Sequence, residues 1–367
     1  MKHVVFAHRK LSFGGGERVL IEQVAALAGL PVKVTVLFRK EPGRRDIEPE
    51  LRARNPNVAE VVHLPGALGA FLWLWRNQPD LLVLCNHKGV QRALPWLARL
   101  GVRLPTVLTL HEHYERHLRK YRGVRNLVDR WLCTYDFTAT VREHLSGAPC
   151  SIIHPLYPRP EAAAATPAER GAARRQLGLP EDATVVGYVG QIDARKDPLG
   201  VVRFAETLGP VHLLFAGRED TATAADLAAR LAASPLRDRT LRLGPQADLG
   251  PAFAALDLYV MTSKNEGFFP LALIEAMERG VPVLAPSVGG IGTVLRDGEG
   301  AFLIAKPDDR RPIDEALLVA AADRVRPLLA DPAAWEDQRR QAHAFGTALT
   351  RGYDAAAAFR DAVAPWL

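Results

Sequence analysis

The feature that most constrains this chain is a regular alternation of short apolar segments with segments of helical periodicity. The apolar segments end at turn residues, as strands do when both faces of a sheet are covered. In the first part of the chain they are His3–Ala7, Val32–Phe38, Leu81–Cys85 and Thr106–Leu110. Between the first two, Glu17–Ala28 repeats apolar residues at helical spacing and ends before Gly29. This alternation predicts an α/β fold with a parallel sheet between two layers of helices.

A change of composition near residue 158 divides the chain. Residues 158–173 are rich in Ala and Pro and lack apolar periodicity, which is typical of a linker. A second alternating series follows: Thr184–Val189, Val211–Ala216, Leu258–Met261 and Pro282–Ala285 as strands, and Leu199–Leu208, Ala224–Ala232 and Leu271–Arg279 as helices. We therefore predict two doubly wound, Rossmann-like domains that face each other across a cleft.

The predicted boundaries are 1–157 for the first domain, 158–168 for the linker and 169–344 for the second domain. A chain of 367 residues is long enough for two such cores. The last stretch, Trp335–Val363, is Ala-rich and helical. The sequence leaves open whether its final part, about 345–367, packs back on the first domain.

Several protein classes are excluded by composition. No run of 18 uncharged apolar residues occurs, so no membrane-spanning helix is expected, and the charged N-terminus does not resemble a signal peptide. The three cysteines, Cys85, Cys133 and Cys150, are too few for a secreted disulfide scaffold. We expect a cytoplasmic protein.

Charge is distributed unevenly along the chain. Residues 1–150 hold 23 Lys and Arg against 13 Asp and Glu, a net +10, whereas residues 151–367 carry a net −4. The excess predicts that the first domain meets anions: nucleic acid, acidic lipid headgroups or a phosphorylated acceptor. The alternative is simple compositional bias, because 38 of the 47 basic residues are Arg. We expect no nucleic-acid partner.

A glycine loop, Gly14–Gly16, precedes the first predicted helix. Glycines at a helix N-terminus let backbone amides approach an anion. A dinucleotide fingerprint fits poorly, because Val19 occupies the position of its third glycine. The loop is therefore either an anion site or a structural turn.

Three loops at strand ends of the second domain carry groups suited to a nucleotide. Lys196 lies in GQIDARKDP (190–198), where it can neutralise a diphosphate. In SKNEGFFPLALIEAM (263–277), Glu275 lies in a helix and can accept both hydroxyls of a ribose, while the amides of Gly267–Phe269 can face phosphate or sugar. The third loop, 286–292, is again rich in glycine.

These blocks, in this order, resemble the family-4 retaining glycosyltransferases of the GT-B fold. The resemblance covers nearly the whole chain. Three further segments contribute to it: FGGGERVL (13–20), LFAGRED (214–220) and APSVGGIGTVLRDG (285–298). The resemblance implies transfer of a sugar from a nucleotide-diphosphate donor to a hydroxyl acceptor with retention of configuration. It implies no carboxylate nucleophile: the departing diphosphate takes the acceptor proton, and domain closure excludes water.

The family's functional residues can be placed on this sequence. The phosphate-binding lysine falls on Lys196 and the ribose-binding glutamate on Glu275. A basic residue that often follows the glycine is Gln191 here, so one phosphate contact is either missing or supplied by Arg195 instead. The sugar-binding glutamate falls on Glu266, with one residue more than usual between it and Glu275. We expect the turn 268–270 to absorb this insertion.

Two further matches lie in the first domain: the glycine loop and a histidine, His111, after the strand near residue 110. The predicted catalytic residues are thus His111, Lys196 and Glu266. The predicted donor-binding residues are Gly15, Gly16, Gln191, Arg195, Lys196, Gly267, Phe268, Phe269 and Glu275. In the next loop the family's glutamate is replaced by Thr293.

No metal site or cofactor is predicted. His113 and His117 are spaced as ligands on one helix face could be, but the zincin pattern fails around them. The chain contains no Asp-x-Asp, so the charge of the diphosphate is expected to be met by Lys196, nearby arginines and helix dipoles.

Some questions stay open at this stage. The acceptor is either a lipid-linked glycan or a small molecule, in envelope or secondary-metabolite glycosylation, and peripheral attachment to an anionic membrane is an expectation. The alternatives are a non-catalytic subunit that binds a nucleotide sugar or glycan, or another enzyme of this fold, such as an epimerase or a phosphorylase. His87 either lines the acceptor side or belongs to an ordinary loop. Trp73 and Trp75 are interpreted as core residues rather than membrane contacts.

Overall fold

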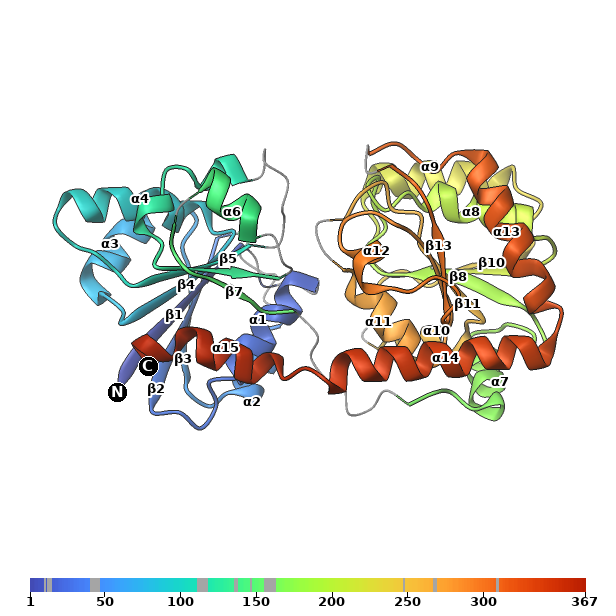
Figure 1. Ribbon diagram of the computed structural model, residues 1–367, viewed down its shortest axis with the longest axis horizontal. Coiled ribbons are helices and arrows are strands. Elements are labelled where there is room, and N and C mark those ends of the chain that lie inside the picture. The colour runs from blue at the N-terminus through green and yellow to red at the C-terminus, as the bar shows by residue number, and fades with distance from the viewer. Residues whose placement is uncertain are drawn as a thin grey trace. The chain divides into compact units, whose positions relative to one another are not determined.

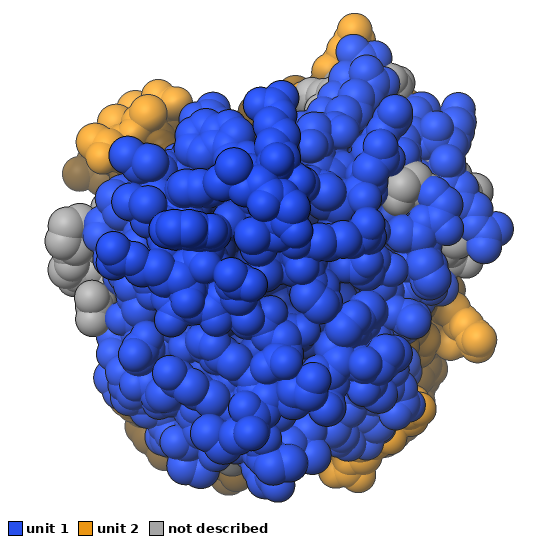
Figure 2. Space-filling view, turned by 90° about the vertical axis from the view of Figure 1, so that its left-hand side faces the viewer, with its two compact units in different colours: residues 1–157, 353–367 blue, residues 158–352 orange. Residues whose placement is uncertain are grey.

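The computed structural model describes residues 1–9, 11, 15–39, 47–110, 118–134, 138–145, 147–154, 163–246, 248–266, 269–307 and 310–367. The chain divides into two compact units, shown in different colours in Figure 2. The first unit comprises residues 1–157 and 353–367, and the second comprises residues 158–352.

Within the described residues, the first unit contains a parallel sheet of seven strands in the order β3-β2-β1-β4-β5-β6-β7 (Figure 1). The strands are β1 (Lys2–His8), β2 (Val32–Phe38), β3 (Val58–His63), β4 (Leu81–Cys85), β5 (Thr106–Leu110), β6 (Arg130–Cys133) and β7 (Cys150–Ile152). The chain runs outward from β1 to β3 and then returns to add β4 on the other side of β1. The carboxyl ends of β1 and β4 therefore flank a topological switch point, where open α/β sheets bind ligands.

Helices cover both faces of this sheet. They are α1 (Gly15–Ala25), α2 (Glu48–Arg54), α3 (Ala67–Asn77), α4 (Lys88–Arg99), α6 (Thr138–His144) and α15 (Ala355–Val363), with the short turns η1 (Arg119–Tyr121), η2 (Arg125–Leu127) and η4 (Ala364–Trp366). Because side chains alternate along a strand, Val4 and Phe6 of β1 enter one core layer and Val5 and Ala7 enter the other.

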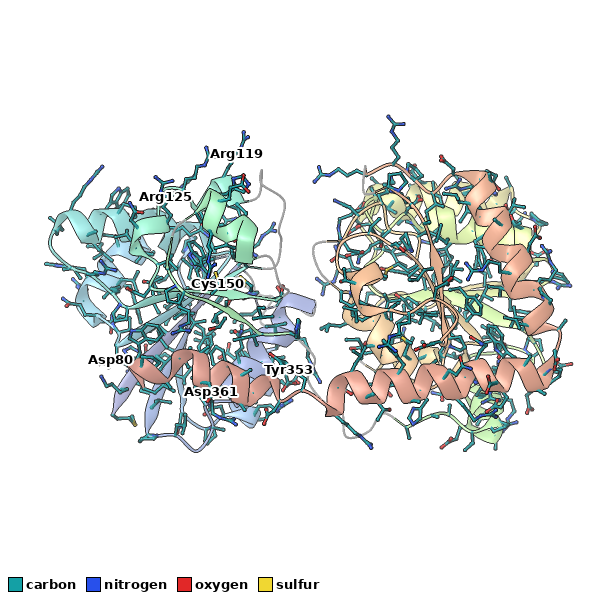
Figure 3. The ribbon with its side chains drawn as sticks, viewed as in Figure 1. Asp80, Arg119, Arg125, Cys150, Tyr353 and Asp361 are labelled. Carbon is teal, nitrogen blue, oxygen red and sulfur yellow. The ribbon has the colours of Figure 1, made fainter. Side chains whose placement is uncertain are left out.

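The C-terminal segment belongs to the first unit. Phe359 of α15 joins the core layer of Phe6, with 6.1 Å between their ring centroids. The hydroxyl of Tyr353, labelled in Figure 3, accepts a hydrogen bond from the amide of His154 at 3.2 Å and donates to the carbonyl of Ile152 at 3.3 Å. These contacts fix the segment against the end of β7.

The second unit contains a six-stranded parallel sheet among its described residues, in the order β10-β9-β8-β11-β12-β13. Its strands are β8 (Val185–Val189), β9 (His212–Ala216), β10 (Thr240–Arg242), β11 (Leu258–Val260), β12 (Val283–Pro286) and β13 (Ala301–Ile304). Its helices are α7 (Pro167–Gln176), α8 (Pro198–Leu208), α9 (Thr221–Ala232), α10 (Gly250–Ala255), α11 (Leu271–Glu278), α12 (Ile291–Val294), α13 (Glu315–Leu329) and α14 (Pro332–Arg351), with the turn η3 (Arg237–Arg239). The switch point lies between β8 and β11.

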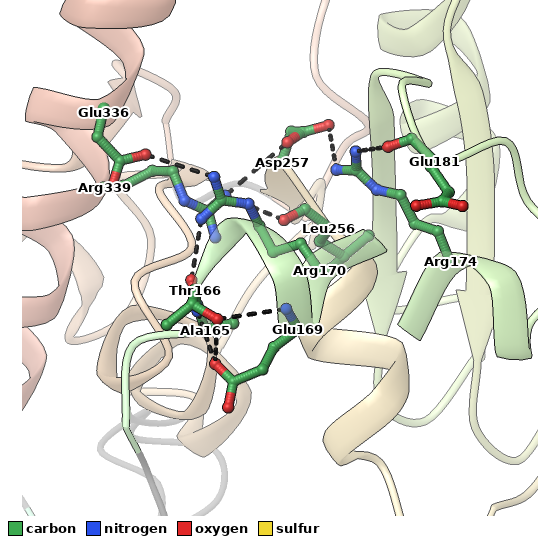
Figure 4. Close-up of polar contacts among 10 residues, drawn as sticks. All are labelled: Ala165, Thr166, Glu169, Arg170, Arg174, Glu181, Leu256, Asp257, Glu336 and Arg339. Carbon is green, nitrogen blue, oxygen red and sulfur yellow. Dashed lines mark hydrogen bonds and ion pairs between the residues drawn. The ribbon is translucent and has the colours of Figure 1, made fainter. Parts of the chain in front are cut away.

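A buried charge network holds two helices to the amino edge of this second sheet (Figure 4). Asp257, just before β11, accepts hydrogen bonds from Arg174 Nη2 of α7 and from the amide of Val185, both at 2.8 Å. Arg339 of α14 lies 3.9 Å from the other oxygen of Asp257 and donates to the carbonyl of Leu256. One carboxylate thus ties α7 and α14 to the starts of β8 and β11.

The predicted α/β class with two doubly wound parallel sheets is confirmed. The stretch Trp335–Val363, predicted to be helical, is divided between two helices: α14 ends at Arg351 with Gly352 as its C-cap, and α15 begins at Ala355. The assignment of Trp75 to the core is wrong, because 47% of its surface is exposed, whereas Trp73 is half-buried and packs its ring against His3. In the described part of the chain, no helix has the length and apolar character needed to span a bilayer.

Candidate functional site

The strongest site candidates gather at the carboxyl edge of the second sheet. The chain leaves β8 at Gly190, which has a φ of 147°. The neighbouring loop after β9 comes so close that a Cβ on Gly217 would lie 1.9 Å from the carbonyl oxygen of Gly190. Only glycine permits this approach, and it brings the two loop exits together.

The loop 190–197 is held in one shape by its own side chains. The carboxylate of Asp193 accepts hydrogen bonds from the amides of Arg195 and Lys196, each at 3.0 Å. Asp197 then adopts a left-handed conformation with a φ of 49°, and α8 begins at the next residue. The carbonyl of Asp197 accepts a hydrogen bond from Thr262 Oγ1 at 2.6 Å, which ties the loop to the end of β11.

Lys196 and Arg195 both contact Glu266, which is separated from them by some 70 residues of sequence. Lys196 Nζ donates to Glu266 Oε1 at 2.5 Å, and Arg195 Nη1 donates to Glu266 Oε2 at 2.8 Å. Lys196 is 9% exposed and Glu266 is 5% exposed, whereas Arg195 reaches solvent. We call these three residues the Glu266 cluster. It brings two cations and one carboxylate to the carboxyl edge of the sheet.

Burial and charge act against each other within the Glu266 cluster. Burial alone would raise the pKa of Glu266, but the charges of Lys196 and Arg195 hold this pKa below its usual range. Burial also lowers the pKa of Lys196, and the nearby charge of Arg195 lowers it further, while Glu266 opposes both effects. The direct hydrogen bonds from the two basic side chains therefore favour the ionised carboxylate of Glu266.

Glu266 is fixed from a third side by the glycine loop after β12. Gly289 has a φ of 58°, and a Cβ at this position would lie 2.3 Å from the carbonyl oxygen of Glu266. The backbone around Glu266 and that around Gly289 are therefore in direct contact. The predicted glycine loop at 286–292 therefore packs against the backbone of Glu266 and helps to position this residue.

Glu275 lies on α11, as predicted, and its side chain is half-buried. The opposite side of the helix buries Leu273, Ile274 and Met277 completely. The charges of Glu266 and Glu275 both raise the pKa of Tyr259, a phenol that burial already moves well above its ordinary value. Both carboxylates therefore lie within electrostatic reach of one buried hydroxyl.

The turn before α11 is the segment that is predicted to absorb the extra residue. Pro270 is the N-cap, with extended backbone at φ −67° and ψ 126°, and α11 begins at Leu271 rather than at the proline. Phe269 is 2% exposed, so its ring packs into the unit instead of facing solvent. Gly267 and Phe268 lie outside the described residues.

Lys264 and Lys306 were not predicted from the sequence, although they stand at the same edge. Lys306 follows β13, is 7% exposed, and donates from Nζ to the carbonyls of Lys264 at 3.2 Å and Pro307 at 2.7 Å. Burial raises the pKa of Asp197, while the charges of Lys264, Arg203 and Lys306 act to lower it. The sequence does contain a signal that could have indicated Lys306, because this lysine follows directly on an apolar run that predicts a strand.

Other predicted site residues are less informative. The side chain of Gln191 is exposed, and its carbonyl accepts a hydrogen bond from the hydroxyl of Tyr188 at 3.0 Å. The hydroxyl of Thr293 donates to the carbonyl of Gly290 within its own turn at 2.8 Å. Among the described residues, no group of three or more His, Cys, Asp or Glu is arranged to hold a metal.

In the first unit, Gly15 and Gly16 form the start of α1. The first turn of this helix also holds Glu17, which is 5% exposed and lies 3.9 Å from His8 Nδ1. The helix N-terminus thus already has a carboxylate beside it. His111, together with His113 and His117, lies outside the described residues.

His87 has a structural role at the carboxyl end of β4. It is fully buried, and its Nδ1 accepts a hydrogen bond from the amide of Val90 at 3.2 Å, which caps α4. Burial lowers the pKa of His87 to about 4, so the ring is neutral at physiological pH. Nearby, the carboxamide oxygen of Asn86 accepts from Lys120 Nζ at 3.3 Å and from the hydroxyl of Tyr121 at 3.2 Å.

Comparison with known protein families gives two matches, one in each unit. Residues 13–155 match the family model described as Glycosyltransferase Family 4, and residues 183–323 match that described as Glycosyl transferases group 1. A D-inositol 3-phosphate glycosyltransferase of Mycobacterium tuberculosis is 31% identical over 291 residues, which cover 73% of this chain. The match covers 58% of the length of that relative.

Solved structures with the same fold cover nearly the entire chain. Anabaena Alr3699/HepE, crystallised with UDP and glucose, has a TM-score of 0.80 at 18% identity and covers 100% of this chain and 99% of its own. A sucrose-phosphate synthase from Thermosynechococcus elongatus has a TM-score of 0.73 at 22% identity, covering 95% of each chain. WaaG, a glycosyltransferase involved in lipopolysaccharide biosynthesis, has a TM-score of 0.70 at 17% identity, covering 98% and 99%.

Proposed function

Because the chain belongs to glycosyltransferase family 4 and has the GT-B fold, we propose that it transfers a sugar from a nucleotide-diphosphate donor to a hydroxyl acceptor, with retention of anomeric configuration. The observation that carries this proposal is the Glu266 cluster. It places two cations and a carboxylate, from segments far apart in sequence, at the carboxyl edge of a doubly wound sheet. Open α/β sheets bind their ligands at such edges.

The donor diphosphate is bound by Lys196 and Arg195 in this proposal. Lys196 is nearly buried, so its charge is poorly screened and acts strongly on a nearby phosphate. A charge-assisted hydrogen bond of this kind contributes about 1.5–3 kcal/mol. Glu275, which is half-buried on α11, accepts the ribose hydroxyls, and Glu266 contacts the donor sugar. His111 stays a predicted contact of the sugar.

The reaction needs no carboxylate nucleophile. As the bond from the anomeric carbon to the diphosphate breaks, negative charge grows on the departing phosphate oxygen, where Lys196 and Arg195 stabilise it. The acceptor hydroxyl attacks from the same face and passes its proton to that oxygen. Glu266 is unsuited to be a nucleophile, because both of its oxygens already accept hydrogen bonds from cations.

Cations of the protein supply the charge that a divalent metal would otherwise supply, so we propose a metal-independent reaction. The acceptor is bound by the basic first unit, and a lipid-linked glycan or a phosphorylated small molecule suits its net charge. Attachment of this unit to an anionic membrane belongs to the same proposal. Among the exposed basic residues are Arg119 and Arg125, which project outward in Figure 3.

Donor turnover by the purified chain tests the proposal. We expect release of the nucleoside diphosphate from one class of nucleotide sugar, at a rate unchanged by chelation with EDTA. A panel of UDP, GDP and ADP sugars identifies the base, and CMP sugars, which carry a single phosphate, serve as the negative control. Binding of a donor without any turnover, even with varied acceptors, would favour a non-catalytic subunit, and conversion of the donor into an isomeric nucleotide sugar would favour an epimerase.

A further inference from the structure

The solvent face of α3 is apolar. Leu68, Leu72 and Trp75 are 64%, 41% and 47% exposed, and their spacing of four and three places them along one side of the helix. The opposite side buries Ala70 and Leu74 in the core of the first unit. A helix that is apolar all round is normally covered on both sides. In α3, the side that carries Leu68, Leu72 and Trp75 is exposed to solvent.

The neighbouring helix α4 extends this apolar face and adds positive charge. Trp96 is 42% exposed, and Leu100, the C-cap of α4, is 62% exposed. Phe71 of α3 meets Trp96 edge-on, with 6.1 Å between the ring centroids, so the two helices present one continuous surface. The basic side chains exposed on the two helices are Lys88, Arg92 and Arg99 of α4 and Arg76 of α3.

We call this region the α3–α4 surface: Leu68, Leu72, Trp75, Trp96 and Leu100, with the four basic residues just named. Single exposed apolar side chains are normal on soluble proteins. A cluster of exposed apolar side chains is unusual on such proteins. Five of the eight large apolar residues that are exposed in the described part of the chain lie on the α3–α4 surface. Neither helix contains an Asp or Glu.

We propose that the α3–α4 surface docks on a lipid bilayer that contains anionic headgroups. Tryptophan and leucine side chains enter the interface between headgroups and acyl chains, while Lys88, Arg92 and Arg99 meet the lipid phosphates. The absence of any carboxylate on either helix complements an anionic surface. This inference deepens the proposed membrane attachment by naming its surface, and it does not depend on sugar transfer.

The apolar component gives this docking a distinct salt dependence. Attraction between exposed charges and lipid phosphates is largely lost at about 1 M salt, where charges are screened beyond about 3 Å. Insertion of Leu72 and Trp75 into the interface does not weaken with salt in this way. We therefore expect the wild-type protein to keep part of its vesicle binding at high salt.

The test is co-sedimentation with vesicles of equal parts phosphatidylglycerol and phosphatidylcholine. The double variant Leu72→Ser with Trp75→Ser removes apolar surface without changing the charge and should lower the partition coefficient at least about tenfold. Val319→Ser, at an apolar side chain of α13 that is 39% exposed, is the matched control and should bind like the wild type. If the double variant does not fold, Leu68→Ser with Leu100→Ser replaces it, since both side chains are more than half exposed.

Three outcomes would overturn the inference. Equal vesicle binding by the folded double variant and the wild type would show that the surface is not inserted. Wild-type dimers that the double variant converts to monomers in size-exclusion chromatography would assign the surface to a second copy of the chain. No vesicle binding by the wild type would end the membrane proposal as a whole, and nucleotide binding would still test sugar transfer separately.

Discussion

Glu266 is the residue on which the charge balance at the carboxyl edge of the second sheet depends. In the structure its two oxygens are occupied by Lys196 and Arg195, the same cations that are proposed to bind the diphosphate. A diphosphate that reaches these cations must therefore compete with the carboxylate or share them with it. Through these two hydrogen bonds Glu266 holds the two cations in place.

This competition leads to a prediction for Glu266→Gln. The variant should turn over donor at least about tenfold more slowly, a loss of about 1.4 kcal/mol or more, because the contact to the sugar is weakened. Its affinity for the free nucleoside diphosphate should be equal to that of the wild type or higher, because the two cations are no longer neutralised. Weaker binding of the diphosphate by a folded variant would show that Glu266 positions Lys196 instead of competing for it.

The same residue predicts a pH dependence of stability. The pKa of Glu266 is lowered by Lys196 and Arg195, so its ionised form stabilises the folded state. This stabilisation is fully present above the pKa of an unfolded glutamate, about 4.3, and is lost as the pH falls through the lower pKa of the folded state. The difference in free energy of unfolding between wild type and Glu266→Gln should therefore shrink with falling pH in urea titrations. A difference that stays constant from pH 6 to pH 3 would contradict the ion pair.

The site could be predicted from the sequence only in part. A phosphate-binding role could be predicted for Lys196 and a ribose-binding role for Glu275, because each residue lies in a short local motif that indicates its chemistry. The direct pairing of Lys196 with Glu266 could not be predicted from the sequence, because it depends on how the pairing of β8 with β11 brings two distant loops together. For Trp75, periodicity indicated a helix with apolar sides, but it could not say which side the rest of the protein covers.

At the scale of helices and strands, burial explains which elements the sequence revealed. Central strands such as β4 and β5 are buried along their whole length, and their continuous apolar runs predicted them within a residue. The edge strand β3 was missed because it is half-exposed and contains Glu60 and His63. Of the other edge strands, β7 and β10 have only three residues each, too few for a periodic signal. The remaining edge strand, β13, has four residues and was missed although it is mostly buried.

The attachment of α7 and α14 to the second sheet gives a prediction at this scale. Asp257→Asn leaves the buried Arg174 and Arg339 without their carboxylate, which should destabilise the second unit by about 3–5 kcal/mol. Burial and the charge of Arg170 already lower the pKa of Arg339 to about 10, while the charges of Asp257 and Glu336 oppose this effect.

Urea unfolding followed by circular dichroism checks this prediction. Asp238→Asn is the matched control, because the side chain of Asp238 is 98% exposed, and its effect should stay within about 0.5 kcal/mol. The network lies at the amino edge of the sheet, so nucleotide affinity under native conditions should be unchanged. A folded Asp257→Asn protein of wild-type stability would show that the arginines are held by their carbonyl contacts alone.

Across the whole molecule, the two units differ in net charge and are proposed to have different functions. The first unit carries the net positive half of the sequence and the α3–α4 surface, and it is proposed to meet the acceptor and the membrane. The second unit carries the Glu266 cluster, Glu275 and the glycine loops at the carboxyl edge of its sheet, where the donor is proposed to bind. Such a division lets donor binding and membrane attachment be tested independently of each other.

Isothermal titration of nucleotides into the purified chain tests the central claim most directly. We predict that one nucleoside diphosphate binds at a single site, more tightly than its monophosphate, and that Lys196→Ala weakens this binding roughly 10- to 150-fold. Lys88→Ala, at an exposed lysine of the first unit, should leave the affinity unchanged. If no diphosphate binds, or if Lys196→Ala binds it as tightly as the wild type, the carboxyl edge of the second sheet is not the donor site.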